Sequence, residues 1–312
     1  MIARSLCLVA SLVLFIASVS ADEKKSAGPI PGIGPKGEVT KVQGEFKFTE
    51  GSAADKDGNI YFSDIPANLV YRLAADGKAS IFRKPSNHTN GRFNAQGELV
   101  SCEMDGQLVA VSPDGKQVRP LAATYEGKRF NAPNDLVIDR SGGVYFTDPH
   151  FLAPDPLPQG VTAVYYVGGG GLVKRLVDDL KAPNGVILST DEKTLYVVPT
   201  MQEEVMAYPI ESPGKIGKGT VFCRLEQRPG QQGHGGDGLT IDTQGNLYIT
   251  SDLGLQVFDR EGKHLGNIEV PEQPANVAFG GSDFKTLYIT ARTSLYRADM
   301  EATGHRFARG EK

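Results

Sequence analysis

Three observations in this sequence of 312 residues predict an all-β fold, a six-bladed β-propeller with a central metal site. A strand–turn–strand unit recurs six times. Its turns begin at intervals of roughly 40 to 52 residues, which is the period of a four-stranded propeller blade. No long stretch carries the 3.6-residue apolar period of a helix, and 37 glycines and 19 prolines suit a turn-rich chain. These observations argue against a helical or βαβ fold.

The unit is clearest from Gly235 to Asp252, where apolar and polar residues alternate on both sides of the turn Asp242–Gly245. This pattern predicts a β-hairpin. Asp237 leads into its first strand, eleven residues before Tyr248. The same spacing separates Glu50 from Tyr61 and Asn134 from Tyr145. A spacing kept in three places indicates a repeat.

Three further copies depart slightly from this pattern. Two carry one extra turn residue and begin with amides, Asn184 and Asn276. The sixth, Phe93–Val100, is degenerate: Thr89 stands eleven residues before Val100, and Asn90 follows one place along. Five of the six hairpins therefore begin with Glu, Asn or Asp.

The first 21 residues predict a secretory signal peptide. Arg4 precedes an apolar run that ends in the small residues of a cleavage site at Ala21. A membrane anchor is the alternative, but the run is short and serines interrupt it. The expected protein is periplasmic or secreted, with no membrane partner once the signal is removed.

The rest of the chain divides into three parts. Residues 22–37 predict a linker or arm rich in charge, Pro and Gly, residues 38–304 the propeller, and residues 305–312 a short polar tail that frays. Glu38–Phe48 alternates like a strand and is expected to pair with the C-terminal strands and close the ring.

Within the propeller, blade one contains the outer strands Leu69–Leu73 and Ala79–Phe82, and blade two runs from Asn90 to Leu121. A Pro-rich loop, Phe151–Val161, is inserted in blade three, and long loops at propeller mouths often build binding sites. The glycine run Gly168–Gly171 has no Lys-Ser/Thr after it, so it predicts a strand connection rather than a phosphate loop.

Cysteines and charge narrow the range of partners. Cys102 and Cys223 remain after signal removal, and a disulfide between them and buried free thiols are equally compatible with the sequence. The formal net charge is −4 with no basic cluster, so nucleic acid and anionic membranes are not expected partners. A monomer or weak oligomer is expected.

The repeated polar position predicts a ring of side chains around one end of the propeller axis, formed by Glu50, Asn134, Asn184, Asp237 and Asn276. Carboxylate and amide oxygens without sulfur or imidazole favour Ca²⁺, with Mg²⁺, Mn²⁺ or Zn²⁺ as substitutes. Only two members carry charge, so a divalent ion would be just neutralised. In the alternative interpretation, each residue forms a local Asx-type turn or caps the strand entry.

Several motifs resemble the SMP-30/gluconolactonase family over nearly the whole mature chain. They are E-G at Glu50, N-A-P-N-D at Asn131–Asp135, F-T-D-P at Phe146–Pro149, A-P-N-G at Ala182–Gly185, D-G at Asp237 and A-F-G-G at Ala278–Gly281. The resemblance implies a six-bladed propeller with a central divalent cation, usually calcium, and hydrolysis of small-molecule lactones.

The resemblance also implies residue roles. Metal ligands fall on Glu50, Asn184 and Asp237, with Asn134 as a further ligand or substrate contact, and Asp237 is the implied general base. The chain departs from the family at two places. Ala132 stands where sugar-lactone members often have Arg, although Arg129 is near. The second-blade motif survives as Asn90-Gly91 and Cys102-Glu103 with one residue missing, and Asn90 and Glu103 are candidate substrate contacts, as is Asn276.

Histidines give a weaker signal. His88 and His234 precede inner strands and are candidates to face the channel mouth, where His234 would contact substrate; solvated loop histidines are the alternative. The leading hypothesis is a metal-dependent lactonase with Asp237 as ligand and base, and phosphotriester hydrolysis on the same ring is a related reaction. A non-catalytic, calcium-plugged propeller that binds a glycan or protein is the second hypothesis. No G-x-S-x-G motif supports an acyl-enzyme route.

Overall fold

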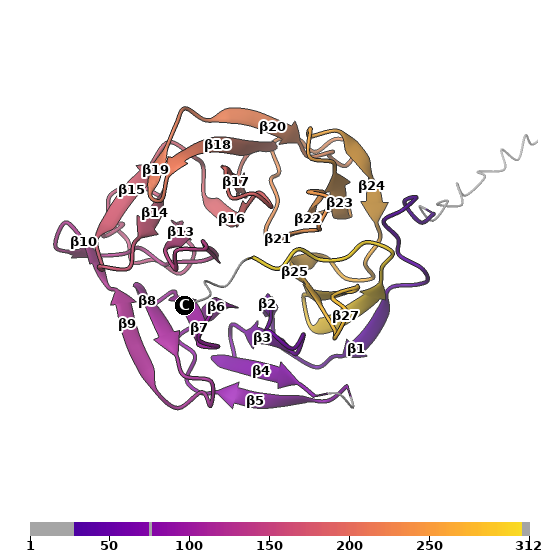
Figure 1. Ribbon diagram of the computed structural model, residues 1–312, viewed down its shortest axis with the longest axis horizontal. Coiled ribbons are helices and arrows are strands. Elements are labelled where there is room, and N and C mark those ends of the chain that lie inside the picture. The colour runs from indigo at the N-terminus through magenta and orange to yellow at the C-terminus, as the bar shows by residue number, and fades with distance from the viewer. Residues whose placement is uncertain (1–27, 75–76, 308–312) are drawn as a thin grey trace, which may run out of the picture.

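The computed structural model describes residues 28–74 and 77–307, which form six antiparallel sheets around a common axis (Figure 1). Blade one contains β2 (Thr49–Ala54), β3 (Ile60–Asp64), β4 (Leu69–Leu73) and β5 (Ala79–Arg83). Blade two contains β6 (Thr89–Phe93), β7 (Leu99–Glu103), β8 (Gln107–Val111) and β9 (Val118–Ala122). Blade three contains β12 (Leu136–Ile138), β13 (Val144–Asp148), β14 (Ala163–Val167) and β15 (Val173–Val177).

The remaining blades follow the same order. Blade four contains β16 (Pro183–Leu188), β17 (Thr194–Pro199), β18 (Glu204–Ser212), β19 (Lys215–Ile216) and β20 (Thr220–Arg224). Blade five contains β21 (Leu239–Ile241), β22 (Leu247–Ser251), β23 (Gly254–Phe258) and β24 (His264–Ile268). Blade six contains β25 (Pro274–Gly280), β26 (Thr286–Ala291), β27 (Ser294–Asp299) and β1 (Thr40–Gln43), and a small hairpin of β10 (Thr124–Tyr125) and β11 (Lys128–Arg129) precedes blade three. The predicted six-bladed propeller is thus confirmed.

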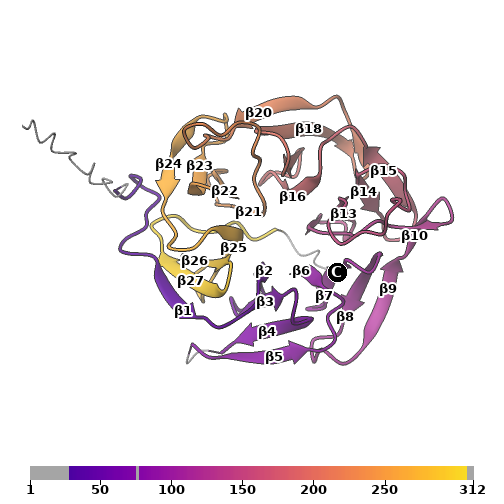
Figure 2. The same ribbon diagram turned by 180° about the vertical axis from the view of Figure 1, so that it is seen from behind.

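The ring closes with a strand from the beginning of the chain. β1 pairs antiparallel with β27, Thr40 opposite Arg297 and Lys41 opposite Tyr296. Figure 2 shows β1 beside β27 from behind. The outer edge of blade six is therefore covered by a segment within Glu38–Phe48, where the sequence predicts the closing strand. Covering an outer edge in this way protects it from pairing with another molecule.

The hairpin turns of blades one, two, three and five share one hydrogen-bond pattern, which fixes the length of the turn in these four copies. Asp242 Oδ1 accepts the backbone N–H of Gln244 and of Asn246, each at 2.9 Å. Gly245 between them has a φ of 88°, which suits glycine. Asp55, Asn94 and Asp139 accept the same pair of bonds in blades one to three. A D/N-x-x-G turn of this kind is an Asx-type turn.

A second set of hydrogen bonds, which we call the belt, joins neighbouring blades. In each of them, a side chain at or just after the end of the second strand of one blade donates to a backbone carbonyl at or just before the start of the innermost strand of the next blade. Thr147 Oγ1 donates to Asn184 O at 2.8 Å, Thr200 Oγ1 to Gly236 O at 3.1 Å, and Thr250 Oγ1 to Ala275 O at 2.9 Å. Ser63 and Cys102 bond to Thr89 O and Asp135 O in the same way. Blades one and six are joined differently: Thr49 Oγ1, on the innermost strand of blade one, donates to Ser294 O on β27 of blade six at 2.9 Å.

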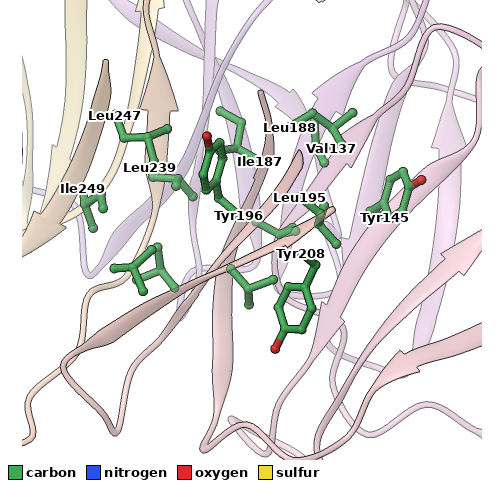
Figure 3. Close-up of a cluster of buried hydrophobic side chains, with 14 of the residues drawn as sticks. Val137, Tyr145, Ile187, Leu188, Leu195, Tyr196, Tyr208, Leu239, Leu247 and Ile249 are labelled. Carbon is green, nitrogen blue, oxygen red and sulfur yellow. The ribbon is translucent and has the colours of Figure 1, made fainter. Parts of the chain in front are cut away.

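The hydrophobic core lies between blades. The cluster in Figure 3 joins blades three, four and five, with Val137, Leu188, Leu195, Leu239 and Leu247 all at most 3% exposed. Fully burying such a side chain contributes about 1.5 to 3 kcal/mol. The second cluster joins blades five and six and includes Ile30 and Ile33 from the predicted arm. Part of the arm is therefore packed against the propeller.

The structure also covers the predicted glycine connection and the two cysteines, but it does not cover the predicted signal peptide. The predicted signal peptide lies outside the described residues, as do the turn residues 75–76 and most of the tail, 308–312. Gly168–Gly171 connects β14 to β15, as expected. Cys102 and Cys223 are buried free thiols rather than a disulfide. No helix in residues 28–74 and 77–307 is long and apolar enough to cross a membrane.

Candidate metal and active site

The repeated polar residues stand where the innermost strands begin, on what we call the entry face. Asn134 and Asp237 lie two residues before the first residues of the blade-three and blade-five strands, and their N–H groups donate to Thr147 O and Thr250 O. Glu50, Asn184 and Asn276 lie where the pairing with the second strand shifts register. Such bulges re-aim a side chain out of the regular ladder. Register shifts therefore re-aim Glu50, Asn184 and Asn276, whereas Asn134 and Asp237 lie just before the regular pairing of their strands begins.

Glu50 and Asp237 form the charged part of the site. Their carboxyl groups are hydrogen-bonded to each other across blades one and five, an arrangement that requires one shared proton. Burial raises the pKa of Glu50 above its ordinary value. Burial raises the pKa of Asp237 well above its ordinary value, and the neighbouring Glu50 charge raises it further. A divalent cation would replace the shared proton and satisfy both oxygens.

Amides from blades three and four complete this pair. Asn184 lowers the pKa of Asp237, and its Nδ2 donates to Thr200 Oγ1 at 2.9 Å. With its nitrogen engaged, Asn184 keeps its oxygen for a cation. Asn134 is 4% exposed, and its Oδ1 is buried with no hydrogen-bond partner in the described part of the chain. An unpaired buried amide oxygen is costly unless a ligand occupies it.

Asn90 takes the place of the degenerate second-blade copy. Asn90 lies opposite Cys102, which corresponds to Ser63 opposite Glu50. Thr89, at the predicted spacing, instead lies opposite Glu103. The first strand of blade two lacks the bulge found at Glu50, so one residue fewer separates the ring position from the turn. Asn90 is 1% exposed, and both heteroatoms of its amide are unpaired in the described residues, so it is a sixth ring member with free polar atoms.

Asn276 serves Glu50 rather than standing free. Its Oδ1 accepts the N–H of Val277 at 2.9 Å, and its amide lowers the pKa of Glu50. The side chain is therefore fixed by its own backbone and stabilises the charged form of Glu50. Its predicted contact with substrate stays a prediction.

The ring fits a hard divalent cation. Glu50 and Asp237 provide carboxylate oxygens, and Asn134 and Asn184 provide amide oxygens, which are the ligands that Ca²⁺ prefers. In the described residues, no three His, Cys, Asp or Glu side chains gather into a metal-binding group, so the donor set differs from that of a typical zinc site. The orphaned Asn134 oxygen and the proton shared by two carboxyls are the two features that a cation would relieve.

Two predicted substrate contacts lie apart from the ring. Glu103 has no exposed surface; its Oε1 accepts Arg83 Nη2 at 2.6 Å, and its Oε2 accepts Asn87 and Gln107. With both oxygens occupied by neighbours, Glu103 anchors the connection between blades one and two. His234 is exposed on the loop that leads to Asp237, and its Nδ1 is 3.1 Å from Asp252 Oδ2. The other mouth candidate, His88, is 3.9 Å from Asp105 Oδ1.

Two acidic residues that the sequence reasoning missed hold the segments before the ring. Asp148 accepts the N–H groups of Asn131 and Ala132 at 2.9 and 2.8 Å, and burial raises its pKa to about 7. Asp64 does the same for Lys47 and Phe48 in blade one. The signal was present as Y-F-S-D at positions 61–64 and Y-F-T-D at positions 145–148.

The segment before Asn134 also anchors the Pro-rich loop, which connects β13 to β14 on the entry face. Asn131 Oδ1 accepts Gln159 N at 3.0 Å, and its Nδ2 donates to Val161 O at 2.8 Å. Arg129 donates to the carbonyls of Phe130 and Asn131, so its guanidinium is engaged with backbone. Ala132 is fully buried in a small apolar cluster. Arg129 thus does not supply the donor that Ala132 lacks.

A buried ion pair is the third feature missed. Arg92 Nη2 lies 3.6 Å from Asp135 Oδ1, joining blade two to blade three. Asp135 is 2% exposed and follows Asn134 directly. Burial raises the pKa of Asp135, and Arg92 opposes that shift. Arg92 and Asp135 are 43 residues apart in the sequence, and no local spacing predicts their contact.

Comparison with known proteins agrees with this architecture. The chain is 31% identical to the gluconolactonase of Zymomonas mobilis over 292 residues, covering 85% of this chain and 82% of the relative. It is 28% identical to the lactonase drp35 of Staphylococcus haemolyticus over 242 residues, covering 74% and 72%. The structure of a gluconolactonase from Xanthomonas campestris superposes with a TM-score of 0.77 at 28% identity, covering 84% of this chain and 89% of that one.

The extent of the family match includes every ring residue. Residues 48–293 match the family described as the SMP-30/Gluconolactonase/LRE-like region. That range begins just before Glu50 and ends just after β26, so it spans all six innermost strands. The chain belongs to the SMP-30/gluconolactonase/LRE-like family.

Proposed function

We propose that the protein is a lactone hydrolase whose ring of Glu50, Asn134, Asn184 and Asp237 holds a divalent cation, with Ca²⁺ the best fit. The observation that carries the proposal is the hydrogen-bonded Glu50–Asp237 carboxyl pair beside an unpaired Asn134 oxygen. Relatives named gluconolactonase and lactonase support lactones as the substrate class. A cation bound there would act as a Lewis acid on the lactone carbonyl.

The residues of the chain account for the proton movements. With the cation in place of the shared proton, Asp237 is ionised and accepts a proton from the attacking water. The water oxygen bonds to the carbonyl carbon, the ring C–O bond breaks, and the ring oxygen takes up the proton as it leaves. The Asn276 and Asn184 amides stabilise the charged forms of Glu50 and Asp237, respectively. General-base catalysis of this kind contributes about 10² to 10⁴ in rate.

The test is Asp237→Asn, which keeps the volume and one oxygen but removes the charge and the base. We expect weaker cation binding and a loss of turnover of about 10² to 10⁴ that persists at saturating metal. The assay is a panel of five- and six-membered sugar lactones with Ca²⁺, Zn²⁺ and Mn²⁺. Asp57→Asn is the control, because it removes a carboxylate from an exposed hairpin turn paired only with Lys56.

Two outcomes would contradict the proposal. Equal turnover in wild type and Asp237→Asn would remove Asp237 from the mechanism. No turnover by wild type across the panel would favour the second hypothesis, a propeller whose cation is structural and whose entry face binds a glycan or protein.

We also propose that the enzyme acts outside the cytoplasm on a small-molecule partner. The N-terminal pattern supports export to the periplasm or outside the cell, with cleavage after Ala21. The absence of a basic cluster from the sequence supports a small-molecule partner rather than nucleic acid. A monomer or weak oligomer is proposed with it.

A further inference from the structure

Arg92 connects three blades close to the ring. It lies two residues after Asn90 on the innermost strand of blade two, so both side chains point to the same side of the sheet. Its Nη1 donates to Ser52 O of blade one at 2.7 Å, and its Nη2 is 3.6 Å from Asp135 Oδ1 of blade three. The side chain is 21% exposed, so the pair is shielded from most of the solvent.

Asp135 is held from several sides. Its Oδ1 accepts Leu136 N at 2.8 Å, and its Oδ2 accepts Val186 N of blade four at 3.3 Å. In the described residues its ion-pair partner is Arg92. A carboxylate buried to this degree is expensive without a cationic partner. Arg92 therefore has a structural reason to be present, independent of any ligand.

The pair also acts on the ring. The Asp135 charge bears electrostatically on both Glu50 and Asp237, and the Arg92 charge bears on Glu50. Three carboxylates from blades one, three and five thus gather near the axis with one guanidinium. Their net charge is −2 when all are ionised, which matches one divalent cation. Without Arg92 the same site would carry −3, and without Asp135 it would carry −1.

We propose that Arg92 is a positioning residue that holds Asp135 and, through this pair, sets the affinity of the ring for a divalent cation. The inference rests on the proposed function, because it concerns the same ring. It assigns to Arg92 and Asp135 opposite effects on cation binding, although neither is a ligand. Removing the guanidinium should tighten cation binding, and removing the Asp135 charge should weaken it.

The experiment uses Arg92→Met, Asp135→Asn, the double variant and Arg92→Lys in the full-length protein. Calcium affinity is measured by titration calorimetry, and melting temperature is measured in chelator. We expect Arg92→Met to lower the calcium dissociation constant and Asp135→Asn to raise it, each by about tenfold at moderate ionic strength. The double variant, which restores the net charge, should return to within about threefold of wild type. Arg92→Lys keeps the charge and should stay close to wild type.

Melting in chelator separates the charge effect from folding. Arg92→Met leaves Asp135 buried and unpaired, so its melting temperature should fall by more than that of the double variant. Arg83→Met is the matched control, since Arg83 pairs with buried Glu103 at 2.6 Å outside the ring. It should also lower the melting temperature but leave the calcium dissociation constant within about twofold of wild type.

The inference would be overturned if Arg92→Met and Asp135→Asn shifted calcium affinity in the same direction. It would also be overturned if the double variant bound calcium more weakly than either single variant. Lactone turnover separates this failure from failure of the proposed function. A wild type that hydrolyses lactones but shows no opposed shifts retains the activity and refutes the role of Arg92. Opposed shifts of calcium affinity in a protein without lactone turnover would support the role of Arg92 and contradict the proposed lactone hydrolysis.

Discussion

Ring side chains bond to their own backbone and also converge on one another. Glu50 Oε2 accepts the N–H of Gly51 at 2.8 Å, and Asn276 Oδ1 accepts that of Val277 at 2.9 Å. These are the local bonds expected if such residues only shaped turns. Yet Glu50 also interacts with the Asn276 amide and with the Asp237 carboxyl group across the axis. The local bond fixes each side chain, and the convergence supplies the candidate site.

The paired carboxyls give a pH dependence to cation stabilisation. Burial raises the pKa of both Glu50 and Asp237, so the cation-free protein holds protons there that the unfolded chain releases at lower pH. These two groups therefore make the cation-free protein less stable as pH rises from the ordinary carboxyl range toward the raised pKa values. A bound cation replaces the proton and removes this loss.

We therefore expect the rise in melting temperature on adding calcium to grow between pH 5 and pH 8. Thermal melts in chelator and in excess calcium measure it, with Asp237→Asn as the comparison because only one of the two carboxyls then remains. A calcium effect that is constant over this range, or that shrinks, would contradict the assignment of these carboxyls as ligands.

At this scale the sequence predicts five of the ring positions, because a spacing of eleven or twelve residues to a tyrosine of the next strand recurs in five hairpins. The sequence predicts Asn90 as a substrate contact rather than as a ring member, since the first strand of blade two has no bulge and the position lies one residue nearer to the turn. The Arg92–Asp135 pair has no such signal. Its geometry depends on how blade two packs against blade three, which is a property of the assembled ring.

The strand elements explain why the ring positions are special. A regular hairpin ladder would direct alternate side chains to the two faces of the sheet. The register shifts at Glu50, Pro183–Gly185 and Pro274–Asn276 interrupt that alternation at the entry face. Alternating apolar residues predict the hairpins, but they do not predict the bulges. A bulge depends on backbone geometry, for which glycine after a polar residue is only a partial signal.

Gly51 is the position where this geometry is most demanding. Its φ is 56°, and a Cβ placed there would lie 2.4 Å from Asn90 Oδ1. We expect Gly51→Ala to lower the free energy of unfolding by about 2 kcal/mol or more, since backbone strain and steric displacement of Asn90 add. Calcium affinity should fall with it. Denaturant unfolding and calcium titration are the measurements.

Gly127→Ala is the matched control, because Gly127 has a φ of 77° with nothing within 4 Å of the added Cβ. It should show only the cost of the left-handed backbone, about 1 kcal/mol, with no change in calcium affinity. An equal decrease in the free energy of unfolding for both variants would show that the close approach of Asn90 to Gly51 does not add to the cost of the substitution.

For the whole molecule, the family-like motifs and the blade period predict the architecture, because each blade repeats the same local hairpin. The closing strand depends on β1 meeting β27. A variant truncated through Gln43 lacks β1 and exposes the outer edge of blade six. We expect a lower melting temperature and concentration-dependent association, since a free strand edge pairs readily. A variant that begins at Gly28 is the control, and equal behaviour of the two in melting and light scattering would contradict the role of β1.

The proposed export gives a prediction for the native protein. Its first residue should be Asp22 or lie within a few residues of it, because the small residues before that point form the cleavage pattern. Intact mass spectrometry of protein isolated from its natural host checks this. A mass that includes the first 21 residues would contradict the proposal.

The pairing of β1 with β27 also sets an order in time. β1 is synthesised before the other described strands, but its partner Ser294–Asp299 is synthesised after all of them. The hydrogen bond from Thr49 Oγ1 to Ser294 O joins two segments that are similarly far apart in the sequence. Early blades can form their hairpins while the chain grows, yet the circle stays open until β27 has been synthesised. Ring closure, rather than hairpin formation, is then the step at which Glu50 finally meets its neighbours from blades five and six.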